Sequence, residues 1–148
     1  MIVVVGGQSR NIGKTSAVCE IIRATPDREW IASKISSHGH GADLRSPVVF
    51  QETAAGPGTD SGRFLEAGAS QALWIRCAGG QLPEALARIP AGNWILESNM
   101  AVSVVAPDVI VFLTDSSIAD CKPSGESLAR SPLRMSVAEA IAWIRRQP

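Results

Sequence analysis

Residues 6–16 read GGQSRNIGKTS, a glycine-rich stretch between two segments of opposite character. The four residues before it, 2–5, are all β-branched and apolar, which is typical of a strand buried on both faces of a parallel sheet. After it, apolar residues recur at positions 17, 18, 21 and 22, the spacing of one helix face between residue 14 and about residue 24. The stretch is therefore predicted to turn a buried strand into a helix.

The rest of the chain continues this alternation. Strands are predicted at residues 30–37, 71–77, 93–98 and 108–114, and helices at about 59–68, 82–90 and 136–147. Ser136 and Glu139 have capping-box spacing at the start of the last helix. The pattern predicts an α/β fold of three layers, a mostly parallel sheet with helices on both faces, and ligands in such sheets bind beyond the carboxyl ends of the strands.

One domain over residues 1–148 is expected, because a chain of this length with 45% hydrophobic residues can bury one sizeable core. Its one long irregular region is predicted at about residues 37–62, with a single short extended segment at 48–52. A segment this long between regular elements is usually functional. We therefore expect a lid or a substrate loop there.

The overall composition excludes several classes of partner. Lysine plus arginine equals aspartate plus glutamate at 14 each, so neither nucleic acid nor a membrane surface is expected as a partner. The apolar opening is too short to cross a bilayer or to act as a signal peptide. Three cysteines without CxxC spacing argue against a disulfide framework, and a cytoplasmic location is expected.

The glycine-rich stretch has the chemistry of a phosphate-binding loop. The usual motif, G-x-x-x-x-G-K-[ST], has four residues between its two glycines. Here five residues separate Gly7 from Gly13, so the loop is one residue longer. Backbone amides of such a turn converge on phosphate at the positive end of the following helix. Lys14 would reach the β and γ phosphates, and Thr15 would ligate Mg²⁺. The alternative is a strand-to-helix junction in which the glycines serve only the backbone.

These arguments predict Mg²⁺ with ATP or GTP as the ligand. The residues predicted to contact the nucleotide in the loop are Gly7, Gln8, Ser9, Asn11, Ile12, Gly13, Lys14, Thr15 and Ser16. Arg10, inside the loop, would be an arginine finger acting in cis or in trans, or else a solvated loop residue. Glu97 ends a predicted strand and is expected to hold Mg²⁺ with Thr15, its alternatives being a surface acid or a neighbour of a helix N-cap. Lys14, Arg10 and Glu97 are the predicted catalytic residues.

Two further groups of residues are weaker candidates. Lys122 and Pro123 follow the strand at residues 108–114 and would flank the base, or form a Pro-Gly turn; ATP and GTP are not distinguished. His38 and His40 could give two ligands to a transition metal, or else be ordinary loop residues. The residues that could supply a third ligand are Asp43, Asp60 and Cys77.

The four tryptophans are expected to pack in the core or between subunits of a homodimer, rather than to stack on a ligand. Three of them begin or lie within predicted strands, and the fourth lies on the last helix. They are Trp30, Trp74, Trp94 and Trp143.

The extended loop resembles the phosphate loops of the dethiobiotin synthetase-like P-loop proteins. A longer resemblance rests on GKTS, on ASKISSHGHG at residues 32–41 and on GTDSGRFLEAGASQALWI at residues 58–75. This order is similar to the molybdopterin-guanine dinucleotide biosynthesis protein B family. The matched positions are Gly13, Lys14 and Thr15 in the loop, Lys34, His38 and His40 in a Lys-His cluster, Asp60 and Ser61, and Ala67, Gly68 and Ala69. The sequence departs from the family after Glu97, where Ser98 and Asn99 replace a glycine and an aromatic residue.

The resemblance implies a P-loop NTPase fold and a protein that hydrolyses NTP or transfers a phosphoryl group in cofactor or small-molecule biosynthesis, of the molybdenum-cofactor type. The long loop would then close over a second substrate. The alternative is a nucleotide-switched adaptor or chaperone that hydrolyses slowly and acts on a partner protein, with the long loop as its switch. A third interpretation is a structural relative that has lost nucleotide binding.

Overall fold

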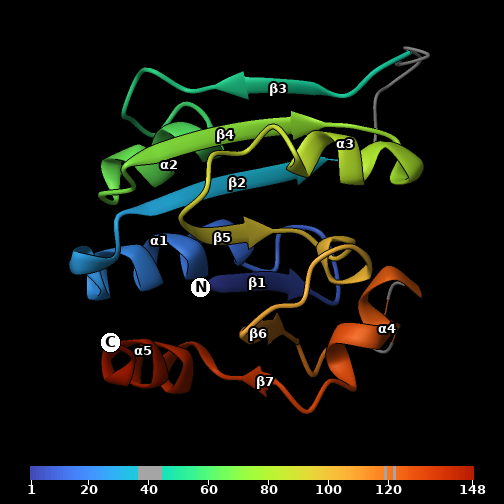
Figure 1. Cartoon of the computed structure of the whole chain (residues 1–148). Coiled ribbons are helices and arrows are strands. Elements are labelled where there is room, and N and C mark those ends of the chain that lie inside the picture. The colour runs from blue at the N-terminus through green and yellow to red at the C-terminus, as the bar shows by residue number, and fades with distance from the viewer. Residues whose placement is uncertain (37–44, 119, 122) are drawn as a thin grey trace.

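The computed structural model describes residues 1–36, 45–118, 120–121 and 123–148, and Figure 1 shows a single sheet with helices packed around it. Among the described residues there are seven strands and five α-helices. The strands are β1 Ile2–Gly7, β2 Trp30–Ser36, β3 Val48–Gln51, β4 Gln71–Arg76, β5 Asn93–Glu97, β6 Val109–Leu113 and β7 Arg134–Met135. The helices are α1 Lys14–Ala24, α2 Asp60–Glu66, α3 Leu82–Leu86, α4 Pro123–Ala129 and α5 Val137–Arg146. Within these ranges, no helix is both long and apolar enough to cross a membrane.

The strands lie in the order β3-β4-β2-β5-β1-β6-β7. Every neighbouring pair is parallel except β3 with β4, which is antiparallel. The prediction of an α/β fold with a mostly parallel sheet is thus confirmed. The chain runs outward from β1 to β2 and β4, then returns to β5 beside β1 and leaves on the other side through β6. The carboxyl end of β1 therefore lies where the connections diverge, the usual ligand position in such sheets.

Two hydrophobic clusters form the core, one on each face of the sheet. On one face Val3 and Val5 of β1 share a cluster with apolar residues of α1, α2 and α5. On the other face Val4 shares a cluster with residues of α3 and α4 and with Ala101, which begins a short 3₁₀ turn. Alternate residues of β1 thus face opposite sides, as the period of a strand requires, and helices cover both faces.

Several helix ends follow from local sequence. Helix α1 runs from Lys14 to Ala24, as its apolar spacing predicts. Thr59 caps α2, its side chain accepting a hydrogen bond from the Gly62 amide at 2.9 Å. Helix α5 begins with the predicted capping box, in which the Ser136 side chain and the Glu139 carboxylate each accept from the other residue's amide.

Two predictions about local structure need correction, and one strand was not predicted. The predicted irregular region ends earlier than residue 62, because Asp60 already begins α2. The extended segment predicted within it at residues 48–52 is confirmed as the paired strand β3. The alternative of a Pro-Gly turn after Lys122 is wrong, because Pro123 begins α4 and its fixed φ suits a first helical turn. Strand β7 is not predicted, because two residues are too few for a recognisable pattern.

The tryptophans lie in three different environments. Trp30 is buried in the core, and its indole N–H donates to the Thr25 hydroxyl at 2.9 Å. Trp94 and Trp143 are half-buried against the two hydrophobic clusters. Trp74 differs from the expectation of core packing, because 39% of its surface is exposed.

Candidate functional site

The glycine-rich loop begins at the carboxyl end of β1, where both glycines are closely packed. A Cβ atom on Gly6 would lie 2.5 Å from Leu128 Cδ2, and one on Gly7 would lie 2.5 Å from Ile12 Cγ2. A side chain at either position would displace a packed neighbouring side chain, so a packing role alone explains both glycines, as the backbone-only interpretation of the motif holds. That interpretation does not explain the features that follow the glycines.

The amino terminus of α1 is open. Its N-cap, Gly13, has φ +94° and ψ 17°, a left-handed conformation that favours glycine. Within the described residues, no side chain caps this helix, and its first turn holds no acidic residue. A Cβ atom on Gly13 would meet no atom within 4 Å. The start of α1 thus has no side-chain cap and no acidic residue at the positive end of the helix dipole, an arrangement suited to an anion.

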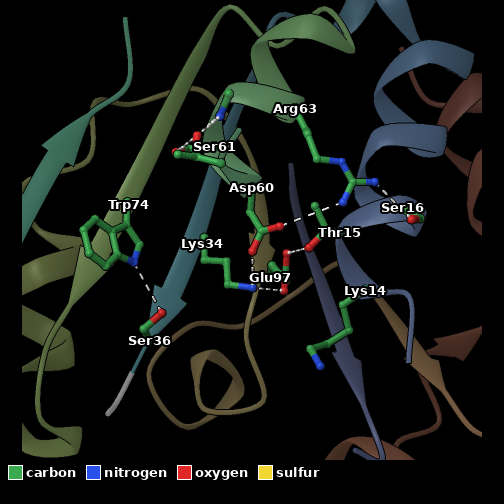
Figure 2. Close-up of polar contacts among 12 residues, drawn as sticks. Lys14, Thr15, Ser16, Lys34, Ser36, Asp60, Ser61, Arg63, Trp74 and Glu97 are labelled. Atoms are coloured by element: carbon green, nitrogen blue, oxygen red, sulfur yellow. Dashed lines mark hydrogen bonds and ion pairs between the residues drawn. The ribbon is translucent and has the colours of Figure 1, made fainter. Parts of the chain in front are cut away.

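Lys14 lies against its own loop. Its ammonium Nζ donates to the backbone carbonyl of Ser9 at 3.0 Å. Figure 2 shows the side chain directed away from the Glu97 and Asp60 carboxylates. The cation is therefore placed beside the loop that is predicted to hold phosphate.

Thr15 and Glu97, the two predicted Mg²⁺ ligands, are in contact. The Thr15 hydroxyl donates to Glu97 Oε2 at 2.8 Å, although 82 residues separate them in sequence. Glu97 is the last residue of β5, and the parallel register sets it beside Val5 of β1. The carboxylate is buried, with a side-chain exposure of 2%. Two hard oxygen donors at one point are the ligands that Mg²⁺ prefers, so the residues present fit the ion.

Lys34 and Asp60 extend this contact into a network, which Figure 2 shows together with Thr15 and Glu97. Lys34 Nζ lies 2.6 Å from Glu97 Oε1 and 2.7 Å from Asp60 Oδ2. Asp60 Oδ1 is 3.9 Å from the Arg63 guanidinium, which also donates to the Ser16 hydroxyl at 3.2 Å. The start of α2 is thereby linked to the first turn of α1.

The charges of this network reinforce one another. Burial works against the charged form of Lys34, but its hydrogen bonds to Asp60 and Glu97 outweigh burial and raise the pKa of the ammonium. Burial likewise works against the charged form of Asp60, and Lys34 outweighs it and lowers the pKa of that carboxyl. Both groups therefore stay charged at neutral pH. A buried carboxylate needs such compensation, which Lys34 supplies to Glu97.

Gln8 and Asn99 brace the loop. Gln8 is predicted as a nucleotide contact, yet its buried amide donates to the Ile118 carbonyl at 2.6 Å and accepts from the Asp115 amide at 3.0 Å. Its side chain thus fixes the turn after β6. Asn99 donates to the Gly7 carbonyl and accepts from the Gly7 amide, each at 2.9 Å. Sequence reasoning identifies Asn99 only as a departure from the family pattern, since its partner lies 92 residues away.

The other predicted site residues are not brought into this network. Ser9 is half-buried, and Arg10 and Asn11 are exposed in the loop, Asn11 with a left-handed φ of +58°. Pro123 is exposed at the start of α4. The remaining candidates, Lys122, His38, His40 and Asp43, lie outside the described residues. Across the described ranges, no group of three or more histidine, cysteine, aspartate and glutamate side chains is placed to hold a metal ion.

Comparisons with protein-family models, with curated proteins and with solved structures gave no match in any of the three.

Proposed function

We propose that the chain is a P-loop protein that binds Mg²⁺ with ATP or GTP at residues 7–16. It hydrolyses the nucleotide or transfers its phosphoryl group in cofactor or small-molecule biosynthesis, of the molybdenum-cofactor type that the sequence resemblance implies. The observation that carries the proposal is the start of α1, which no side chain caps, where left-handed Gly13 precedes Lys14 and Thr15, and Thr15 contacts the buried Glu97. This combination supports a phosphate site with a cation beside it.

The competing interpretation, in which the loop serves only the backbone, gives no reason for a carboxylate at this position. A carboxylate that is 2% exposed is costly to bury, and Glu97 needs the ion pair with Lys34 and the hydrogen bond from Thr15 to offset that cost. Its place at the end of β5, in contact with the residue that follows the loop lysine, supports a role toward a bound cation.

Each group would have one task. The amides of the loop and Lys14 would stabilise the charge on the transferring phosphoryl group. Thr15 and Glu97 would hold Mg²⁺, which when bound neutralises phosphate charge. Arg10, exposed in the same loop, would approach the γ-phosphate of its own or of a partner's nucleotide. Asn99 and Gln8 would keep the loop in shape before the nucleotide arrives.

Thermal unfolding with nucleotide tests the proposal. At a concentration about 100 times Kd, Mg·ATP or Mg·GTP should stabilise the native state by about 2.7 kcal/mol and raise Tm by about 5–10 °C. Lys14→Ala should abolish this shift and keep the fold. Arg23→Ala removes an exposed cation from the last turn of the same helix and should keep the full shift. If neither nucleotide shifts the wild-type protein at millimolar concentration, the proposal is wrong.

A nucleotide switch is the second candidate function. Asp60 and Arg63 connect the start of α2 to Lys34 and to Ser16, so a change at the loop reaches α2 directly. A switch hydrolyses slowly alone and relies on a partner protein for turnover. Measured turnover separates the two candidates, because rapid multiple-turnover hydrolysis by the chain alone excludes the switch.

A further inference from the structure

A pocket of about 410 Å³ opens beside Lys34 and Asp60, on the side of Glu97 away from the glycine-rich loop. Its volume lies in the range of sites for small molecules. Phe50 of β3 and Trp74 of β4 form its apolar walls. The pocket therefore combines aromatic surface with a charged pair that already belongs to the proposed nucleotide site.

The strand register sets these residues in one row across the sheet. Phe50 pairs with Trp74, Trp74 with Lys34, Lys34 with Glu97, and Glu97 with Val5. Paired residues of neighbouring strands point to the same face, and Val5 belongs to the cluster under α1 and α2. The row leads from the aromatic walls to the strand that carries the loop.

The aromatic walls are unusually exposed. Phe50 is 50% exposed and Trp74 is 39% exposed. Of the five large hydrophobic side chains that stand exposed in the described residues, three lie on β3 and β4, the third being Val48. Clustered exposed apolar surface next to polar groups marks a binding site more often than scattered residues do. Figure 2 shows the indole N–H of Trp74 donating to the Ser36 hydroxyl, at 3.4 Å. The Arg76 guanidinium lies over one face of the ring, 5.3 Å from its centroid, so a stacked ligand would use the other face.

The rim of the pocket is preorganised by Glu52. Its carboxylate accepts from the hydroxyls of Thr59 and Ser61 at 2.8 and 3.0 Å, and from the amides of Thr53 and Ala54 at 3.1 and 3.2 Å. These four bonds fix the connection between β3 and α2. A wall that is already ordered costs less free energy to use in binding than one that must be ordered by the ligand.

We propose that this pocket binds a small molecule with a planar nitrogen-containing aromatic ring, which stacks on Trp74 and donates N–H groups to the Asp60 carboxylate. The lining holds two carboxylates, Glu52 and Asp60, and the Asp60 side chain is 37% exposed although it already pairs with Lys34. The Lys34 ammonium is itself bound by two carboxylates, so the lining favours a donor ring over an anionic one. The assignment of this ring to the second substrate rests on the proposed nucleotide function. The prediction that the pocket binds such a ring does not depend on that function.

The test uses 2-aminobenzimidazole, a flat ring with paired N–H donors, and 1-methylindole, a flat ring without them. The indole N–H signals of the tryptophans are followed by NMR, with the Trp74 signal assigned by its loss in Trp74→Phe. We expect 2-aminobenzimidazole to move the Trp74 signal saturably, with Kd of about 1 mM. Asp60→Asn should weaken this probe about tenfold and leave 1-methylindole unchanged.

Three controls separate the possible outcomes. Phe50→Ala changes an exposed residue and should weaken the binding of both probes, read from the Trp74 signal, while the thermal unfolding midpoint stays close to wild type. Trp94→Phe should leave binding unchanged. Lys14→Ala should also bind the probes normally, so a protein that binds the ring but no nucleotide would refute only the proposed function.

Two results would overturn the inference. The first is a Trp74 signal that does not move with 2-aminobenzimidazole, or that moves equally in Asp60→Asn. The second is a Trp74 signal that changes with protein concentration alone, together with a dimer in analytical ultracentrifugation, because a second copy of the chain would then cover the aromatic walls.

Discussion

Replacing Lys34 with methionine removes one ammonium and keeps most of the apolar stem. The ammonium now lies 2.6 Å from Glu97 Oε1 and 2.7 Å from Asp60 Oδ2. The two carboxylates are affected differently, because the Glu97 side chain is 2% exposed and that of Asp60 is 37% exposed. Water can take over the role of Lys34 at Asp60, but it cannot readily do so at Glu97.

The expected cost follows from these exposures. Removing one partner of a buried ion pair costs about 3–5 kcal/mol, because the other charge stays buried. Lys34 is 27% exposed, so solvent screening places its pair with Glu97 at or below the lower end of that range. Its pair with the more exposed Asp60 adds less than about 1 kcal/mol. We therefore expect Lys34→Met to lower the free energy of unfolding by about 2–3 kcal/mol at pH 7, and Tm by about 5–10 °C.

Urea unfolding of the wild type, Lys34→Met, Glu97→Gln and the double variant measures the pair itself. The double variant should be more stable than Lys34→Met alone, because the amide of glutamine carries no buried charge, and the coupling energy should be at least about 1.5 kcal/mol. Arg130→Met is the matched control, since its pair with Glu126 spans 3.5 Å and its side chain is 81% exposed. It should cost less than about 0.5 kcal/mol. Equal losses in Lys34→Met and Arg130→Met, or no coupling in the cycle, would refute the reasoning.

Three further substitutions test the loop and the network. Asn99→Ala breaks both hydrogen bonds to Gly7 and should lower the free energy of unfolding by about 1–3 kcal/mol, so an unchanged urea midpoint would contradict the bracing role. Gly13→Ala should lower the free energy of unfolding by only about 1 kcal/mol, because alanine is strained at this left-handed φ. Calorimetry should show a much larger loss in the free energy of nucleotide binding, and a binding loss no larger than the unfolding loss would place the phosphates elsewhere. The folded pKa of Asp60 lies below its ordinary value of 3.8, so the stability advantage of wild type over Asp60→Asn should be full well above pH 3.8 and fall as the pH drops through the lower folded pKa. Urea unfolding at pH 7, 5, 3 and 2 measures this loss, and an advantage undiminished at about pH 2 would argue against the ion pair with Lys34.

The features that were predictable from the sequence are those stabilised by residues close together in the chain. The run of β-branched residues, the glycines and the apolar spacing after Lys14 predict β1, the turn and α1, and the structure has all three. The capping box of α5 involves Ser136 and Glu139, three residues apart, and it forms as predicted. That Glu97 ends a strand was also visible from the apolar residues before it.

Long-range contacts were decided only by the folded chain. Nothing in the local pattern states that β5 lies between β1 and β2, and this order alone brings Glu97 to both Thr15 and Lys34. The antiparallel pairing of β3 with β4 sets Trp74 beside Phe50. Trp74, which was expected in the core, therefore forms a wall of the pocket. Strand order and register depend on which apolar faces can be buried together by the whole sheet, a free energy that no short segment carries by itself.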